Sequence, residues 1–570
     1  MMLPIPKKFK KTPAYRTFQQ LIGNPVVDDF SRFNLGGVPI PRGIEPRHFI
    51  IIGSTGGGKS VALKTVLDQA DKANQRAIVM DNSADFANRY YNEARGDVIL
   101  NPYDKRCVNW SPLAEIRHEP DARAMAASIC PLAEGADKTW TQAGQNFIYS
   151  ILLKLLYEQN PTTGDFLHWV VSATPEELRE FLAGTEARPY VEEGNERYFG
   201  SVRSTALERV SIFAALPQDA GRDNGFSIRD WIAEDGKSWL FCTYTADQLN
   251  SLRYLISTVI DTVATSALSL SQSETRRLFI GIDEWPAIGK INSIGEILAQ
   301  GRKFGACLLA ATQSRAAIEV KYGDKDTSAL FANFNTWLMM RVQEESAAIL
   351  CSGVCGKGDY ERRTLSISHG QGGASGNFGV QVERDVPAVT PSEFQNLPAA
   401  DAETMTPPVG YLKIAGSIPV CRVTLSFPPK RPDRIGYIAH PNLKDRRNRV
   451  EGLMAAAAKI RAGESASLDA LLAEISENDA SPSPKQSQPG IIIVPEPVKK
   501  KASSHAPSAP SPQVAPNIPA QAEETSTSGD VLGAAESESA VNAVNAADDS
   551  PDPLAALDKL GSALSSLPDD

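Results

Sequence analysis

The segment RHFIIIGSTGGGKSVALKTVL, residues 47–67, constrains the fold of this 570-residue chain more than any other stretch. Its apolar run Phe49–Ile52 predicts a buried strand of a parallel sheet. The strand leads into GSTGGGKS at 53–60, which fits the phosphate-binding pattern G-x-x-x-x-G-K-[ST] throughout. A helical pattern then runs from Val61 to about Ala70. The succession of strand, glycine-rich loop and helix predicts an α/β nucleotide-binding fold.

The loop supplies the predicted contacts with ATP or GTP. Its glycines allow backbone N–H groups to surround phosphate oxygens without interference from a Cβ atom. We expect Lys59 to reach the β- and γ-phosphates and the Ser60 hydroxyl to hold Mg²⁺. The helix that follows directs its N-terminal dipole at the phosphates. The predicted nucleotide-binding residues are Gly53, Ser54, Thr55, Gly56, Gly57, Gly58, Lys59, Ser60 and Val61.

A second strand supplies the acidic residues that hydrolysis needs. In RRLFIGIDEWPAIG, the apolar run Leu278–Ile282 ends at Asp283 and Glu284. We expect Asp283 to coordinate Mg²⁺ together with Ser60, and Glu284 to polarise the attacking water. An acidic pair after a strand can also be simple turn chemistry. Downstream of a complete phosphate loop, it favours a nucleotide hydrolase.

Lys59 and Asp283 are 224 positions apart, which is too far for a compact kinase or GTPase core. The residues between them explain the gap, because a helical pattern occupies most of that stretch. The simplest interpretation is an α/β domain, residues 30–113 and 237–445, that is interrupted by an all-α domain at 114–236.

Two polar residues after the acidic strand are further candidates. A predicted strand at Ala306–Ala311 is followed by Thr312 and Gln313, so Gln313 would lie at a strand tip beside the acidic pair and sense the γ-phosphate. Arg302 lies near the end of the preceding helix. It is either an ordinary surface arginine or, in a ring of subunits, an arginine finger for the neighbour's nucleotide.

Composition excludes several classes of protein. No apolar run approaches the ~18 residues that a membrane-spanning helix needs, and the N-terminal MMLPIPKKFKK lacks the apolar core of a signal peptide. The seven cysteines are scattered, and Cys351 and Cys355 have no second pair or nearby histidine, which argues against zinc. These features predict a cytoplasmic protein with reduced thiols.

The net charge of −10 is unevenly distributed along the chain. Residues 464–570 carry 17 acidic side chains against 5 lysines and no arginine, whereas 1–463 have a net charge of +2. The C-terminal sequence is rich in Ala, Ser and Pro and lacks aromatic residues, so it cannot bury enough apolar surface to offset its ordering entropy. We expect residues 446–570 to form a largely disordered tail.

Several shorter segments leave alternatives open. Leucines at helical spacing in 467–477 and 552–567 form either transient helices or short helical motifs that fold against a partner. The basic N-terminal segment, 1–29, is either a solvated charge run or a contact for anionic lipid or nucleic acid. The densest basic segment, KRPDRIGYIAHPNLKDRRNR at 430–449, either contacts DNA or acidic partners or is the solvated end of the domain.

The series of motifs resembles a known family. FNLGGVPIPRGIEPRHFIIIGSTGGGKS, TWTQAGQNF, FIGIDEWPAIG, GRKFGACLLAATQS and a later segment beginning VERDVPAVTPSEF occur in the order of the TraD/TrwB-type coupling proteins of type IV secretion and plasmid conjugation. Those proteins belong to the FtsK–HerA class of ring-forming DNA motors. The resemblance covers about 30–445.

This resemblance implies a RecA-like P-loop domain with an all-α insertion, assembled as a homo-hexamer that hydrolyses ATP and translocates DNA without sequence specificity. The implied partners are a relaxase or relaxosome and the proteins of the secretion channel. By motif, the resemblance assigns the phosphate, Mg²⁺, hydrolytic, sensor and trans-arginine roles to Lys59, Ser60, Asp283, Glu284, Gln313 and Arg302.

Members of the family typically begin with transmembrane helices, and this sequence shows none before the phosphate loop. The expectation is either a membrane-anchored partner, which would place the protein peripherally at the inner membrane, or a soluble motor. Two other functions stay open. One is a related motor in segregation or DNA processing, and the other is a nucleotide-switched docking scaffold with little hydrolysis.

Overall fold

A nine-stranded sheet forms the centre of the computed structural model, which describes residues 6–9, 30–133, 135–370, 373–416, 419–431 and 434–462. In spatial order its strands are β14 (Cys421–Thr424), β13 (Val409–Ile414), β10 (Thr336–Met339), β4 (Phe49–Ile52), β9 (Ala306–Thr312), β8 (Leu278–Ile282), β5 (Arg76–Asn82), β7 (Leu240–Tyr244) and β6 (Val98–Ile99). The strands from β10 to β6 run parallel, and β13 and β14 are antiparallel at one edge. β4, β8 and β9 are buried along their whole length, as expected for strands covered on both faces.

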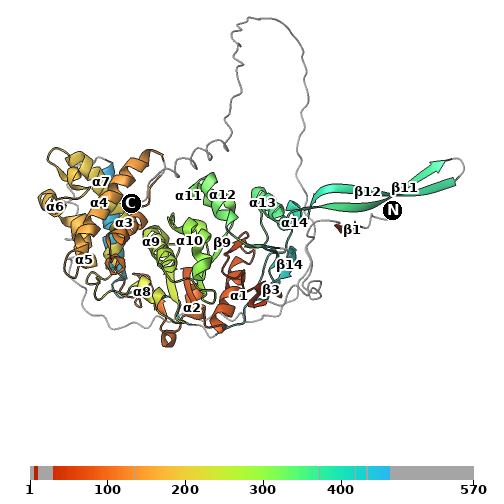
Figure 1. Cartoon of the computed structure of the whole chain (residues 1–570), viewed down its shortest axis with the longest axis horizontal. Coiled ribbons are helices and arrows are strands. Elements are labelled where there is room, and N and C mark those ends of the chain that lie inside the picture. The colour runs from red at the N-terminus through yellow and green to blue at the C-terminus, as the bar shows by residue number, and fades with distance from the viewer. Residues whose placement is uncertain are drawn as a thin grey trace, which may run out of the picture. The chain divides into compact units, whose positions relative to one another are not determined.

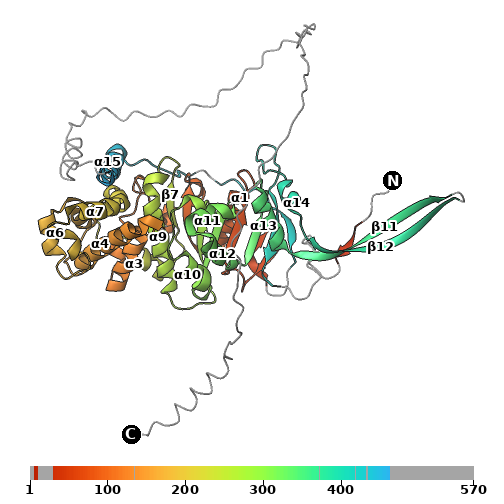
Figure 2. The same ribbon diagram turned by 90° about the horizontal axis from the view of Figure 1, so that it is seen from above.

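Helices cover both faces of this sheet (Figures 1 and 2). α1 (Lys59–Lys72) and α2 (Asp85–Tyr90) pack into the core of one face, and α9 (Leu249–Leu268) and α10 (Ile294–Gln300) into the core of the other. The architecture confirms the predicted α/β class. Helix α1 begins two residues before the expected start at Val61, because the phosphate loop leads into it without a spacer.

The chain between β6 and β7 is helical. Its α-helices are α3 (Glu119–Ile129), α4 (Lys138–Leu156), α5 (Thr163–Leu167), α6 (Pro175–Phe181), α7 (Glu196–Val210) and α8 (Ile228–Ala233). α4 packs against both α3 and α7, and Figure 1 shows these helices grouped beside one end of the sheet. Contacts of α3 and α8 with α9 join this helical domain to the α/β domain.

The helical domain also contains a helix that the sequence placed in the tail. α15 (Leu443–Arg461) packs against α7 and the short helix Ser211–Ala215. Its apolar face is buried and consists of Val450, Leu453, Ala456 and Ala457. The predicted tail boundary at 446 is therefore wrong, because the charged residues of the first turns concealed a helix that only tertiary packing stabilises.

The basic segment 430–449 connects the two domains. Arg431 forms ion pairs with Asp68 at 3.1 Å and Asp71 at 2.6 Å, both on α1. Arg434 donates to the Tyr90 carbonyl at 2.6 Å, and Arg447 pairs with Asp247 at 2.7 Å. These arginines bind the chain's own carboxylates and carbonyls, so they form an internal strap between α1 and α15, whereas Lys430 and Lys444 of the same segment are exposed.

Two smaller sheets accompany the main one. β2 (Phe30–Leu35) pairs with β3 (Val38–Pro41), and a long hairpin of β11 (Lys357–Gly370) and β12 (Gly373–Pro387) pairs with β1 (Pro6–Phe9). Figure 2 shows the hairpin extending away from the main sheet, a feature that no motif predicted. The other helices of the described ranges are α11 (Arg315–Tyr322), α12 (Asp324–Ala332), α13 (Glu345–Cys355) and α14 (Pro391–Gln395).

Some of the sequence-based predictions concern other parts of the chain. The leucine motifs at 467–477 and 552–567, and most of the basic segment 1–29, lie outside the described residues. Within the described ranges, no helix combines the length and the apolar character needed to cross a membrane.

Replacing Arg431 with alanine should lower the free energy of unfolding by about 1 kcal/mol, because Asp68 and Asp71 each lose one of two arginine partners at a partly buried position and keep only Arg89 and Arg95 respectively. Thermal denaturation followed by circular dichroism measures the change. Arg117→Ala is the matched control, since Arg117 pairs with Asp230 where both side chains are 44% and 58% exposed. Equal melting curves for the two variants would contradict a stabilising strap.

Candidate functional site

The phosphate-binding loop lies at the carboxyl end of β4 and leads directly into α1. Gly56 and Gly58 have φ angles of 71° and 102°, a region that residues with a Cβ atom rarely adopt. At Gly58, which caps α1, an added Cβ would also lie 2.5 Å from Pro408 Cβ. The glycines therefore set the shape of the loop, and the N-terminus of α1 opens into it as a phosphate site requires.

Lys59 occupies the first turn of α1. Its ammonium group donates to the carbonyl oxygens of Gly53 at 2.9 Å and Ser54 at 3.4 Å. Burial lowers the pKa of Lys59, and the charges of Glu284 and Asp283 oppose that shift. The cation thus lies within the electrostatic reach of both carboxylates, where it can bind a phosphate group.

Asp283 follows β8 and is joined to α1 by a direct contact. The Ser60 hydroxyl donates a hydrogen bond to Asp283 Oδ1 at 3.0 Å, across 223 positions of sequence. Burial raises the pKa of the Asp283 carboxyl, while the Ser60 hydrogen bond and the Lys59 charge lower it. The structure therefore brings together the two residues that the sequence predicted as ligands of one metal ion.

The Ser60 and Asp283 oxygens fit a Mg²⁺ site. Mg²⁺ prefers octahedral oxygen coordination at about 2.1 Å, and it usually needs only one or two protein ligands beside waters and substrate phosphates. Among the described residues, no cluster of three or more His, Cys, Asp or Glu side chains forms an all-protein metal cage. A hydroxyl and a carboxylate next to a phosphate loop are the donor set expected for a Mg²⁺–nucleotide complex.

Glu284 and Gln313 lie beside each other at the ends of the neighbouring strands β8 and β9. Gln313 Nε2 donates a long hydrogen bond of 3.4 Å to Glu284 Oε2. Burial raises the pKa of the Glu284 carboxyl, and the Lys59 charge and the Gln313 bond lower it. A partly buried carboxylate next to a phosphate loop is suited to accept a hydrogen bond from water.

Arg302 lies at the opposite edge of the sheet from the phosphate loop. It belongs to the short helix Gly301–Phe304 immediately before β9, whereas Gln313 follows β9. Because β9 is extended over its whole length, its two ends are about 20 Å apart. Arg302 therefore cannot reach a nucleotide bound in the loop of its own chain.

Arg47, which the sequence did not single out, lies close to Arg302. It precedes β4 and donates its Nε to the Gly43 carbonyl at 3.0 Å. Burial lowers the pKa of Arg47, and the positive charge of Arg302 lowers it further. A cavity of about 1140 Å³ at this edge is lined by Arg42, Arg302 and Lys303, among others. The sequence alone does not show that β4 and β9 are parallel neighbours. With that information, Arg47 and Arg302 could have been paired, because the amino ends of these two strands lie at one edge of the sheet.

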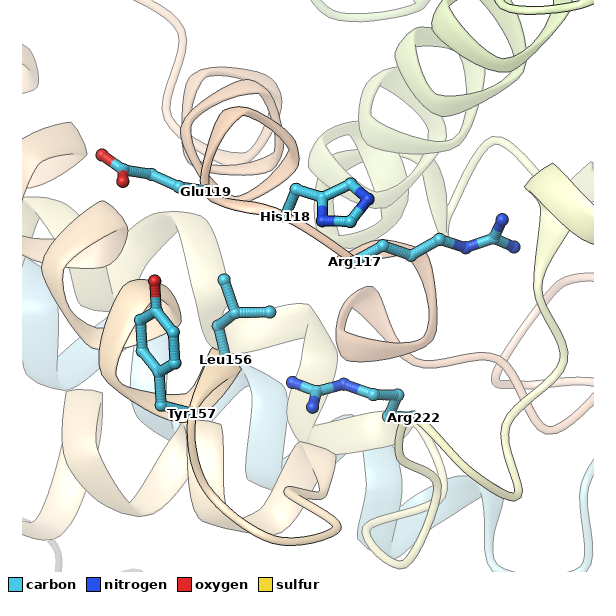
Figure 3. A pocket seen from close by; sticks show the side chains of 6 residues that line it. All are labelled: Arg117, His118, Glu119, Leu156, Tyr157 and Arg222. Atoms are coloured by element: carbon cyan, nitrogen blue, oxygen red, sulfur yellow. The ribbon is translucent and has the colours of Figure 1, made fainter.

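A separate cavity of about 410 Å³ lies in the helical domain, between the start of α3 and the end of α4 (Figure 3). Its lining residues are Arg117, His118, Glu119, Leu156, Tyr157 and Arg222. Arg117 pairs with Asp230, and Arg222 donates to the Leu155 carbonyl at 3.3 Å. The cavity contains none of the predicted nucleotide-binding residues and is not part of the candidate site.

The phosphate loop after β4, the acidic pair after β8 and Gln313 after the intervening β9 define a RecA-like P-loop nucleotide-binding protein. Within this class, the family described as type IV secretion-system coupling protein DNA-binding domain matches residues 32–426. The chain belongs to this family. The resemblance to TraD/TrwB-type coupling proteins is thereby confirmed.

Named relatives agree with this assignment. Coupling protein TraD of Escherichia coli (strain K12) is 28% identical over 437 residues, which are 75% of this chain and 59% of TraD. The chain thus spans about three-fifths of the length of this curated relative. Structures of the plasmid coupling protein TrwB in complex with the ATP analogue ADPNP, and with ADP and Mg²⁺, are both 27% identical, with TM-scores of 0.65 and 0.64. Each similarity covers 76% of this chain and 98% of the TrwB chain.

Replacing Gly58 with alanine should weaken nucleotide binding by at least about tenfold, because the added Cβ meets Pro408 and the left-handed backbone must change. Titration calorimetry with ADP and Mg²⁺ measures the affinity. Gly96→Ala is the matched control: its φ is 80°, and its nearest neighbour, Ser238 Cβ, is 3.9 Å away. Wild-type affinity in Gly58→Ala would contradict the role of this residue in shaping the loop.

Proposed function

We propose that this protein is an ATP-driven DNA translocase that serves as the coupling protein of a conjugative type IV secretion system. Its family, whose matched domain is described as DNA-binding, supports this assignment. TraD is named a coupling protein, and TrwB is named a plasmid coupling protein in complexes with analogues of ATP and GTP. The motor part of the proposal rests on the geometry of this chain.

One observation carries the proposal of a multisubunit ATPase. Arg302 and Arg47, which could complete the site, lie at the edge of the sheet opposite the phosphate loop of their own subunit. In a head-to-tail ring, the same two surfaces meet at every interface. The amino edge of one subunit, with Arg302 and Arg47, then faces the phosphate loop of the next. We take the hexamer as the ring size, as the family resemblance implies.

Within one subunit, the residues divide the work of hydrolysis. Lys59 binds the β- and γ-phosphates, and Ser60 and Asp283 hold Mg²⁺, which neutralises charge on the phosphates. Glu284 accepts a hydrogen bond from a water molecule and orients it for in-line attack on the γ-phosphate. Gln313 fixes the Glu284 carboxylate through the bond between them and senses the γ-phosphate.

The neighbouring subunit contributes positive charge to the transition state. Arg302 is exposed and belongs to the short helix that precedes β9. Arginine fingers raise phosphoryl-transfer rates by about 10³–10⁵. Arg47 precedes β4 at the same edge, and the charge of Arg302 lowers its pKa, so a second positive charge accompanies Arg302 at this edge. Because each site needs an arginine from the next subunit, ATP is hydrolysed only when the ring has assembled.

DNA is the proposed substrate, bound without sequence preference through phosphate contacts of loops that line the pore of the ring. The basic segment 430–449 is not assigned to DNA, since Arg431, Arg434 and Arg447 are engaged within the chain. Relaxase or relaxosome proteins and components of the secretion channel are the proposed protein partners.

Lys59→Ala should abolish ATP turnover, because the transferring phosphate loses its cation, and Glu284→Gln should still bind ATP but hydrolyse it at least about 100-fold more slowly. Phosphate release with and without DNA measures both, and DNA should stimulate the wild type. Glu176→Gln, which changes a glutamate that is 71% exposed in the helical domain, is the matched control and should behave as wild type. Normal turnover in either site variant would reject the corresponding role.

Arg302→Ala should lose turnover while it keeps its affinity for ATP, because the missing group belongs to the neighbour's site. Mixing Arg302→Ala with Lys59→Ala subunits tests this directly. Some mixed interfaces pair an intact loop with an intact finger, so partial ATPase activity should return. A mixture as inactive as its parents, under conditions where light scattering shows assembly, would count against an arginine acting in trans.

A further inference from the structure

Three polar residues form one row across the carboxyl edge of the sheet. The register of the parallel strands aligns Tyr244 of β7 with Asn82 of β5, and Met80 of β5 with Ile282 of β8. If the alignment of β5 with β8 is continued by two residues, Asn82 lies level with Glu284. The backbone of Glu284 is still extended there, with φ −139° and ψ 89°. Each step across the row is one strand spacing of about 4.8 Å, within reach of neighbouring side chains.

A parallel row one residue earlier supports this alignment. Thr243 is paired with Asp81, and the β5–β8 register continued by one residue brings Asp81 level with Asp283. Asp81 is buried and accepts the backbone N–H groups of Phe86 and Ala87 at 3.1 Å and 2.6 Å. Burial raises the pKa of Asp81 to about 7, with a further contribution from the charge of Asp283. Asp283 and Asp81 therefore lie near each other, as the continued register requires.

The Tyr244 hydroxyl is the unexplained member of the first row. The side chain is 1% exposed, and its oxygen is buried without a hydrogen-bond partner among the residues that the structure describes. A buried hydroxyl left unpaired is costly, and such groups in native proteins call for an explanation. Burial raises the pKa of the phenol, and Asp283, Cys242, Asp81 and Glu284 add to the shift in decreasing order, so the acidic pair acts on the hydroxyl together with two buried neighbours.

The chemistry of the row matches from one residue to the next. A phenol donates a hydrogen bond, a side-chain amide both accepts and donates, and a carboxylate accepts. Asn82 is half-buried, and its recorded side-chain contact is a 3.5 Å approach of the Ser83 hydroxyl to its oxygen. Asp283 already receives the Ser60 hydroxyl, whereas from the part of the chain that the structure describes Glu284 receives the long bond from Gln313 alone. Glu284 is therefore the carboxylate that this row can serve.

We propose that Tyr244 and Asn82 are positioning residues for Glu284: when ATP is bound, the Tyr244 hydroxyl, which is unpaired among the described residues of this structure, donates to the Asn82 side-chain oxygen, and the Asn82 amide nitrogen donates to the Glu284 carboxylate. Gln313 holds the carboxylate from the β9 side, and this row holds it from the β5 side. With both contacts made, the carboxylate keeps one orientation toward the attacking water. The inference rests on the proposed ATP hydrolysis and concerns residues outside every motif that the sequence revealed.

Tyr244→Phe and Asn82→Ala test the row in the full-length protein. Each should lower kcat by about tenfold, the scale of one lost hydrogen bond, while the affinity for ADP and Mg²⁺ stays within twofold of wild type. In the absence of nucleotide, Tyr244→Phe should not lower the melting temperature, because the hydroxyl has no hydrogen-bond partner within the described ranges of the structure. Tyr103→Phe is the matched control, a buried tyrosine whose hydroxyl donates to Ser251 at 3.3 Å, and it should leave kcat unchanged.

Double variants separate positioning from a general structural effect. If the three residues act as one unit, Tyr244→Phe combined with Asn82→Ala should be no slower than either single variant, and neither change should slow Glu284→Gln further. Additive losses, or a fall in kcat that follows a fall in melting temperature, would overturn the proposal. So would wild-type kcat in Tyr244→Phe. A wild type without any ATPase activity would instead reject the proposed function on which the inference rests.

Discussion

The common direction of the central strands is the constraint on which the site depends. Because β4, β9 and β8 are adjacent and parallel, their carboxyl ends meet at one edge of the sheet. Residues hundreds of positions apart are thereby brought into contact, as the Ser60–Asp283 hydrogen bond shows. The same direction sends the amino ends of β4 and β9 to the other edge, which separates Arg302 and Arg47 from the phosphate loop.

Burial gives this edge its chemical character. The pKa of Lys59 is lowered and those of Asp283 and Glu284 are raised, in each case mainly by burial, and the opposite charges partly restore the ionised forms. The three groups therefore depend on one another for their charged states. A Mg²⁺–nucleotide complex suits such a site. Its phosphates are negative and match Lys59, and its metal ion is positive and matches the two carboxylates.

The helical domain depends on contacts that begin and end far apart in the chain. It is inserted between β6 and β7, yet α15 returns from the C-terminal side to pack on α7. On the way, Arg431 binds Asp68 and Asp71 on α1, the helix that begins with Lys59. The strap thus links the nucleotide-binding helix to the helical domain through ion pairs, and it places the arginines of 430–449 at an internal contact.

The sequence by itself determined the fold class and the family, and it singled out Lys59, Ser60, Asp283, Glu284 and Gln313 as candidates, because a phosphate loop and a strand ending in acidic residues are local patterns with a fixed chemistry. Strand order is not local, so only the tertiary structure decided that β9 lies between β4 and β8 and that Arg302 is out of reach of its own nucleotide. It also decided the place of α15, whose charged first turns hid a buried face, and the row of Tyr244 and Asn82, which exists only as an alignment of three separate strands. Neither could be read from spacing, since both follow from packing between segments that the sequence keeps far apart.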